Sequence, residues 1–188
     1  EGLGGTYRFL QRVWTLVQEF LEEIKEQRSK NKYQRTAGHN AELEVQIVRT
    51  VHKAIKKVSQ DMQELGFNTA IAAMMETVNE LYKIKSEHPS TALGAGNFAL
   101  ARDAWHDALI ALTQLLAPFA PHIAEEIWEG LGQSGSVHIS KWPTWDEELV
   151  KEDMITIAVQ INGKVRDELL LPADVTEEDA IEAAKKSE

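Results

Sequence analysis

The residues of this chain best suited to chemistry are cations that recur along one predicted helix. Asn40 is a predicted N-cap, and the cations that follow it stand at offsets of three and four on one strip of the helix: Arg49, His52, Lys53, Lys56 and Lys57. Like charges on one strip repel one another, so a bound anion such as phosphate would stabilise them. The strip predicts a polyanion-binding surface, with a solvated lysine-rich helix face as the alternative.

A second pair of cations lies near the start of the chain. Arg8 and Arg12 are four residues apart in a helix predicted from Thr6 to Glu26, so they share a face. Trp14 lies close to the apolar stripe of that helix, which consists of Leu10, Val13, Val17, Phe20 and Ile24. The favoured interpretation of these residues alone is that both arginines are solvated and that Trp14 packs in the core.

A metal site is the next arrangement to weigh. Asp103 and His106 stand three apart on one predicted helix, and His122 and Glu125 three apart on the next. Di-iron bundles use Glu-x-x-His on two helices and further inward Glu residues on two others. Here one motif carries Asp, the other is reversed, and inward Glu residues are missing, so capping or surface roles are favoured. A Gly-rich phosphate loop and a Ser-His-Asp arrangement are also absent from the sequence, so these residues predict no catalysis, cofactor or metal.

Charge and composition narrow the class of protein. The net charge is −10, but residues 1–64 hold 11 Lys and Arg against 9 Asp and Glu, while residues 65–188 hold 9 against 21. A polyanion is therefore expected to contact the first third. The sequence has no cysteine, which fits a reducing cytoplasm, and no apolar run near the ~18 residues of a membrane span. Because it lacks an initial Met and a leader, we expect it to begin inside a longer cytoplasmic protein.

Helical periodicity extends over residues 1–132. We expect polar loops at 27–39 and 86–97, and Asn68 or Thr69 as the cap of a third helix. Pro118 ends a fourth helix, and Pro121 begins a fifth. The buried stripe predicted for the second helix is Ala41, Val45, Val48, Val51, Ile55, Val58 and Met62. The pattern predicts a mainly α fold, an antiparallel helical bundle of the first 132 residues.

Residues 133–188 do not continue the pattern of the helical bundle. Residues 133–153 hold two tryptophans and a proline and are predicted to form a connector packed on the bundle. In residues 154–188, strands around Asn162-Gly163 predict a β-hairpin, and Thr176 with Asp179 predicts a capping box before a short helix. Two strands alone are marginally stable, so this α+β module is expected to be incomplete.

Several motifs, in the same order, resemble bacterial-type leucyl-tRNA synthetases. They are Arg8-Phe9-Leu10-Gln11-Arg12-Val13-Trp14, then Phe67-Asn68-Thr69-Ala70-Ile71-Ala72-Ala73-Met74-Met75-Glu76, then Leu116-Ala117-Pro118-Phe119-Ala120-Pro121-His122-Ile123-Ala124-Glu125-Glu126-Ile127-Trp128. The first and third also have relatives in valyl, isoleucyl and methionyl enzymes, so they indicate a class I (class Ia) anticodon-binding helical domain. The stretch from Val159 to Arg166 favours leucine. The resemblance covers nearly the whole chain.

The resemblance implies a longer parent protein in which catalysis and tRNA binding take place in different parts of the chain. The parent would join leucine to tRNA(Leu) with ATP and Mg through an aminoacyl-adenylate, and would carry catalytic and editing domains upstream. The nucleotide-binding signatures of that class do not occur here. The chain would therefore be the anticodon-binding domain and the start of a C-terminal domain, with no membrane and no DNA as partner.

The resemblance and the cations together predict a tRNA phosphate surface. Its predicted members are Arg8, Arg12, Arg49, His52, Lys53, Lys56 and Lys57, with Asn68 as a weaker candidate. Lys164 and Arg166 have the same parity in the second predicted strand and form a candidate second contact. Two alternatives stay open: the corresponding region of a valyl or isoleucyl relative, and a non-enzymatic helical module whose acidic second half binds a basic protein.

Overall fold

The computed structural model describes residues 3–29, 40–88, 98–151, 154–161, 164–172 and 175–186. The chain separates into two compact units, Glu1–Val150 and Lys151–Glu188. Within these described ranges, the first unit is helical and the second holds both strands. No helix in the described part of the chain is long and apolar enough to cross a membrane.

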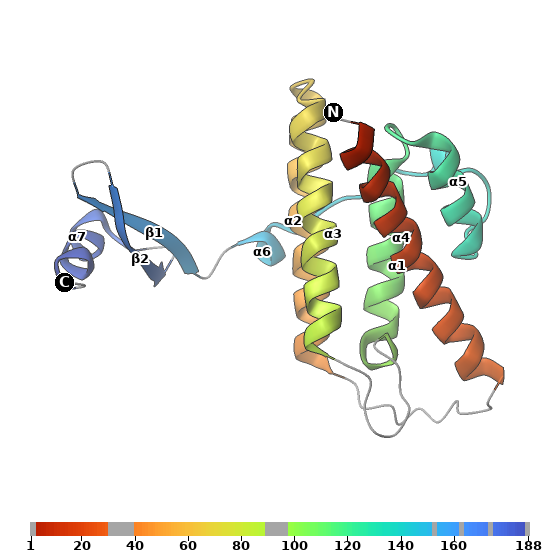
Figure 1. Ribbon diagram of the computed structural model, residues 1–188, viewed down its shortest axis with the longest axis horizontal. Helices are drawn as coiled ribbons and strands as arrows, with labels where there is room; N and C mark the ends of the chain where they lie inside the picture. The colour runs from red at the N-terminus through yellow and green to blue at the C-terminus, as the bar shows by residue number, and fades with distance from the viewer. Residues whose placement is uncertain are drawn as a thin grey trace. The chain divides into compact units, whose positions relative to one another are not determined.

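The described residues of the first unit form a bundle of long helices (Figure 1). They are α1 (Leu3–Ser29), α2 (Ala41–Gln63), α3 (Phe67–Glu87), α4 (Arg102–Leu116) and α5 (Pro121–Gly130), with the 3-10 turn η1 (Ala99–Ala101) before α4. In Figure 1, α2 and α3 form an antiparallel hairpin, with α4 and α1 beside it. The mainly α, antiparallel bundle predicted from the periodicity is confirmed.

Aromatic rings anchor the core of the bundle. Phe98 lies between two of them: its ring meets Phe20 at 5.4 Å and Trp105 at 5.1 Å, edge to face in both cases. All three side chains are fully buried, as are Leu16 of α1, Leu43 and Ile47 of α2, and Met74 and Leu81 of α3. Edge-to-face pairs add about 0.5–1.5 kcal/mol each beyond the burial of apolar area. The interpretation of Trp14 as a core residue is wrong, because its side chain is 36% exposed.

The first half of α2 buries a different stripe from the predicted one. Leu43 and Ile47 are fully buried, whereas Val45 is 47% exposed. Both stripes continue into Val51, Ile55 and Val58, which are buried as predicted. Leu and Ile remove more apolar area from water than Ala and Val, so the helix turns these larger side chains inward.

The helix ends show one prediction confirmed and one wrong. The Asn40 side chain accepts a hydrogen bond from the backbone N–H of Leu43 at 3.1 Å, so it caps α2 as predicted. The cap of α3 is Gly66, not Asn68 or Thr69, because the α2–α3 turn closes within Glu64–Gly66 and α3 begins at Phe67. The Thr69 hydroxyl donates to the Gly66 carbonyl oxygen at 2.8 Å, so it still contributes to this turn.

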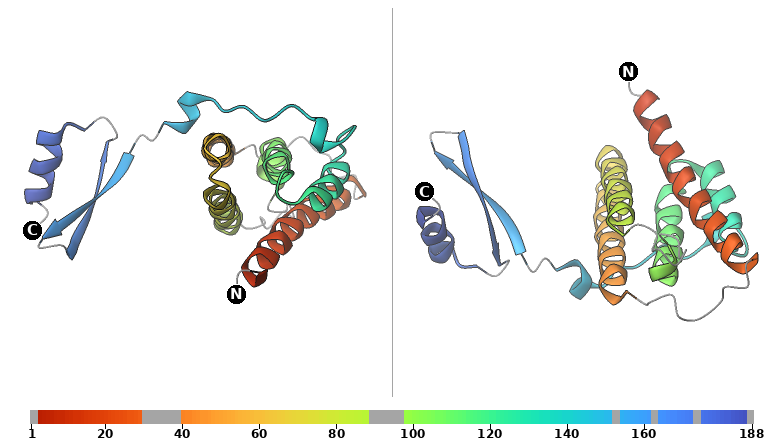
Figure 2. Two further views of the ribbon diagram at one scale, coloured as in Figure 1. Left: turned by 90° about the horizontal axis from the view of Figure 1, so that it is seen from above. Right: turned by 60° about the horizontal axis from the view of Figure 1, so that its bottom comes forward.

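The segment after α5 runs across α4 to α2 (Figure 2). It includes the turn η2 (Val137–Ile139) and the short helix α6 (Glu147–Val150). The Gln114 amide of α4 donates to the carbonyl oxygen of Lys141 at 2.9 Å. Further on, the indole N–H of Trp142 donates to the hydroxyl of Ser59 on α2 at 2.8 Å. Of the predicted connector, residues 133–150 belong to the first unit, and below we use the name connector for these residues only.

The second unit holds the predicted hairpin strands and the short helix. Strand β1 (Met154–Ile161) pairs antiparallel with β2 (Lys164–Pro172), with a register shift between Val159 and Gln160. The predicted turn residues Asn162 and Gly163 lie outside the described residues. Helix α7 (Glu177–Lys186) follows. Thr176 caps it: its hydroxyl oxygen accepts from the Asp179 N–H at 3.3 Å and its O–H donates to the Asp179 carboxylate at 2.7 Å.

Candidate nucleic-acid interface

The basic strip of α2 meets the connector. The Lys56 ammonium lies 2.7 Å from a carboxylate oxygen of Glu147 in α6, and the Lys56 side chain is 30% exposed. One turn earlier, Nδ1 of His52 accepts a hydrogen bond from the backbone N–H of Asp146 at 2.9 Å. The Trp145 indole N–H donates to the second carboxylate oxygen of Glu147 at 2.8 Å. Two predicted phosphate ligands, His52 and Lys56, are therefore engaged by the chain itself.

The contact with the connector changes the acidity of His52. Burial lowers the pKa of the His52 imidazole from its ordinary value of 6.5, and the nearby Asp146 carboxylate opposes that shift more weakly. The hydrogen bond also requires an unprotonated Nδ1, because both ring nitrogens of an imidazolium are donors. At neutral pH His52 is therefore an uncharged acceptor and not a cation.

The other cations of the strip lie in different environments. Lys57 is exposed and pairs with the buried carboxylate of Asp61 one turn later, at 2.7 Å. The hydrogen bond from Lys57 lowers the pKa of Asp61, and burial opposes this effect. Lys53 is exposed and Arg49 half-buried. The argument that the strip needs an external anion is therefore wrong for Lys56 and Lys57, because carboxylates of the same chain already neutralise them.

The arginines of α1 lie on another surface. Arg8 is exposed, and Arg12 reaches α3, where its guanidinium donates to the side-chain oxygen of Asn79. The Arg12 guanidinium also lies 4.7 Å from the ring centroid of Tyr82, whose hydroxyl donates to the Arg12 carbonyl oxygen at 3.0 Å. Burial, with the charge of Glu19, raises the pKa of Tyr82. Arg12 therefore joins α1 to α3 while its side chain stays exposed.

Sequence reasoning missed Asn79 and Tyr82 as the residues that hold Arg12. They lie 67 and 70 residues away in the chain. Both occur on the same face of the third predicted helix, three apart, which is the only sequence signal that links them.

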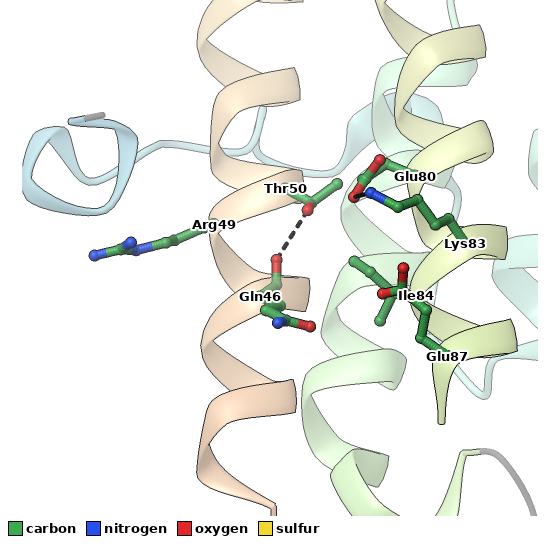
Figure 3. A pocket seen from close by; sticks show the side chains of 7 residues that line it. All are labelled: Gln46, Arg49, Thr50, Glu80, Lys83, Ile84 and Glu87. Carbon is green, nitrogen blue, oxygen red and sulfur yellow. Dashed lines mark hydrogen bonds and ion pairs between the residues drawn. The ribbon is translucent and has the colours of Figure 1, made fainter. Parts of the chain in front are cut away.

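A shallow pocket of about 260 Å³ lies between α2 and α3. Figure 3 shows Thr50 of α2 facing Glu80 and Lys83 of α3, whereas Arg49 extends away from α3. Lys83 pairs with Glu80 at 3.4 Å, and Glu87 adds another acid to the lining. The lining holds two acids and two cations, so the pocket does not gather positive charge for a phosphate.

The remaining predicted contacts are dispersed. Asn68 is exposed in the first turn of α3. Lys164 and Arg166 belong to β2, and their side chains lie outside what the structure describes.

One residue of each His and acid motif, His106 and Glu125, makes a structural contact. Glu125 accepts hydrogen bonds from the Ser136 hydroxyl at 3.0 Å and the Val137 N–H at 3.2 Å, so it caps η2. A ring nitrogen of His106 lies 3.1 Å from the Leu131 carbonyl oxygen. Among the described residues, no three His, Asp or Glu side chains are grouped so as to hold a metal ion.

Comparison with known proteins adds independent findings. A profile of the family described as "Anticodon-binding domain of tRNA ligase" matches residues 44–181. Proteins named leucine–tRNA ligase from Dehalococcoides mccartyi, Rubrobacter xylanophilus and Chlorobaculum tepidum are 43%, 38% and 41% identical over essentially the whole chain. The chain spans about 20% of the length of each of these curated relatives.

A solved structure is also similar. It is the ternary complex of a leucyl-tRNA synthetase (agnB2 LeuRS) of Agrobacterium radiobacter K84 with tRNA and LeuAMS. The match has a TM-score of 0.64 and 32% identity, and covers 95% of this chain and 21% of the solved one.

Proposed function

This chain belongs to the family of anticodon-binding domains of tRNA ligases, and we propose that it is the tRNA-binding portion of a leucine–tRNA ligase. The observation that carries the proposal is similarity over the whole of this chain, at 38–43% identity, to proteins that bear that name. The names favour leucine over valine or isoleucine. The 32% identity to a synthetase solved with tRNA supports the same partner.

The proposal extends to the longer protein. That protein would attach leucine to tRNA(Leu) in the cytoplasm, using ATP and Mg in a catalytic part outside these residues, with no need for a membrane or DNA. This chain would supply binding energy and register, since contacts to phosphates position a nucleic acid without reading its sequence.

Within the chain, we assign phosphate contacts to exposed cations on α1 and α2, among them Arg8 and Lys53. Arg12 is exposed as well, and its position is fixed by Asn79 and Tyr82. Preorganised cations lose little freedom on binding, so they yield more affinity per contact. His52 and Lys56 could join this surface only after the connector releases them.

The test uses the full-length protein and tRNA(Leu) at several salt concentrations. Arg8→Glu and Lys53→Glu are each compared with Lys141→Glu, which makes the same charge change at an exposed position of the connector. Each lost phosphate contact is expected to weaken binding and to reduce the slope of log affinity against log salt by about one. Slopes equal to that of the control would remove these residues from the interface. Failure of the unmodified protein to bind tRNA(Leu) would overturn the function itself.

A further inference from the structure

Arg12 is held by partners that do not cancel its charge. Its guanidinium donates to the side-chain oxygen of Asn79 and lies 4.7 Å from the ring centroid of Tyr82, and both of these residues belong to α3. An amide oxygen and an aromatic face attract a cation, but neither carries a negative charge. Arg12 therefore keeps its positive charge in a fixed place, at an exposed position of α1.

Four lysines of the described helices show the opposite arrangement. They pair with carboxylates at 2.7–3.4 Å, and they are Lys56, Lys57, Lys83 and Lys85. A carboxylate at position 79 would hold Arg12 more firmly than Asn79 does, because the guanidinium fits a carboxylate with two parallel hydrogen bonds. A neutral amide is the weaker link between α1 and α3, but it leaves the cation available to another anion.

Glu19, two helical turns after Arg12 on α1, is neutralised by a different residue. Its carboxylate lies 2.7 Å from the ammonium of Lys85, whose side chain is only 16% exposed. The same ammonium lies 5.8 Å from the Tyr82 ring centroid, so Tyr82 stands beside both cations. Asn79, Tyr82 and Lys85 are spaced three apart along α3 and share a face. We call these three residues the arginine cradle.

The held guanidinium has donors left for a second partner. The bond to Asn79 uses one terminal nitrogen, Nη1, and an arginine side chain has several further N–H donors. A phosphate accepts two parallel N–H bonds from a guanidinium. An arginine that is free in solution must be ordered to make such bonds, whereas Arg12 is already ordered by the cradle.

We propose that the arginine cradle positions Arg12 for one phosphate of tRNA. Asn79 and Tyr82 are the positioning residues, and Lys85 keeps the Glu19 carboxylate from pairing with Arg12. This inference rests on the proposed function, because it needs tRNA as the ligand. The cradle touches the cation and not the phosphate, so its effect on tRNA binding passes through Arg12 alone.

The first test is Asn79→Asp in the full-length protein, measured for tRNA(Leu) affinity at several salt concentrations and for thermal stability. The new carboxylate would pair with Arg12, so thermal stability is expected to be retained while the slope of log affinity against log salt falls by about one. Gln63→Glu makes the same amide-to-carboxylate change at an exposed position of α2 and is expected to keep the slope. If Asn79 only held α1 to α3, affinity would follow stability.

The second test separates the ring of Tyr82 from its hydroxyl. Tyr82→Phe keeps the ring beside the guanidinium and loses only the hydrogen bond to the Arg12 carbonyl oxygen at 3.0 Å. It is expected to bind tRNA(Leu) as the unmodified protein does. Tyr82→Leu removes the ring, so binding is expected to weaken about two- to tenfold, because Arg12 must then be ordered by the phosphate. In an Arg12→Gln background, Tyr82→Leu is expected to change the affinity no further.

Three outcomes would overturn the inference. The salt slope of Arg12→Gln could equal that of the unmodified protein, Asn79→Asp could weaken binding no more than Gln63→Glu, or Tyr82→Leu could weaken binding equally with and without Arg12. Each of these, in a protein that binds tRNA(Leu), refutes only the role of the cradle. Failure of the unmodified full-length protein to bind tRNA(Leu) refutes the proposed function instead.

Discussion

The ammonium of Lys56 lies 2.7 Å from the carboxylate of Glu147, a residue 91 positions later in the chain. This pair joins the middle of α2 to the short helix at the end of the connector. A phosphate that approached Lys56 would have to displace the carboxylate, so the connector would compete with an RNA backbone for this cation. How readily Lys56 can bind a phosphate therefore depends on the connector, a segment that the helical pattern of α2 does not reveal.

Neutralising Glu147 is expected to strengthen tRNA binding. In Glu147→Gln the Lys56 ammonium loses its internal partner and becomes available to phosphate. Because the Glu147 side chain is 62% exposed, the pair is worth only about 0.5–1 kcal/mol, so affinity should rise about two- to fivefold at low salt. Fluorescence anisotropy with labelled tRNA(Leu) measures this. The matched control is Glu126→Gln on α5, and an equal gain in both variants would mean that only net charge matters.

Acidification is expected to release the connector. The pKa of His52 is lowered in the folded protein, so the neutral imidazole is the form that the docked connector favours. The stabilisation is complete above the unperturbed value of 6.5 and is lost as pH falls through the lowered pKa. The fluorescence of Trp142 and Trp145 should report this transition. In His52→Gln, whose amide oxygen can accept the Asp146 N–H at any pH, the transition should vanish, and its persistence would assign it to another group.

Removing the indole donor of Trp142 is expected to destabilise the packing of the connector. In Trp142→Phe the buried hydroxyl of Ser59 loses the hydrogen bond that Trp142 donates at 2.8 Å. The expected cost is about 1 kcal/mol in the free energy of unfolding. A double-mutant cycle with Ser59→Ala, followed by urea denaturation, measures the coupling energy between the two side chains. A coupling energy near zero would show that the bond contributes nothing in solution.

The two residues of the α2–α3 turn should respond in opposite directions. Leu65→Gly relieves a left-handed conformation that costs about 1–2 kcal/mol for a non-glycine residue, offset by roughly 0.5–1 kcal/mol of added chain entropy. The thermal stability of Leu65→Gly should therefore equal or exceed that of the unmodified protein. Gly66→Ala should destabilise the protein, because a Cβ there would lie 2.8 Å from the Thr69 hydroxyl oxygen and 3.3 Å from the Asp61 carbonyl oxygen. Calorimetry that ranks Gly66→Ala above Leu65→Gly would refute this account.

The sequence by itself determined most of the local elements, although not the cap of α3, and it determined the family. The helical spacing in α1, the Asn40 cap, the Pro118–Pro121 corner and the Thr176 cap depend on neighbours within a few residues, so one chain segment carries all the information. The motifs near Arg8, Phe67 and Pro118 also stand in contiguous stretches, which is why the resemblance agrees with the comparisons.

Only the tertiary structure decided the chemical state of the cations. Whether His52 is a cation or a neutral acceptor, and whether Lys56 faces solvent or Glu147, depends on where a segment some ninety residues later returns. The same holds for the inward turn of Leu43 and Ile47 in place of Val45, and for the meeting of Phe67 with Phe119. The type of each residue determines whether its side chain is charged or apolar. Which partner neutralises or buries that side chain is determined by packing across the whole bundle.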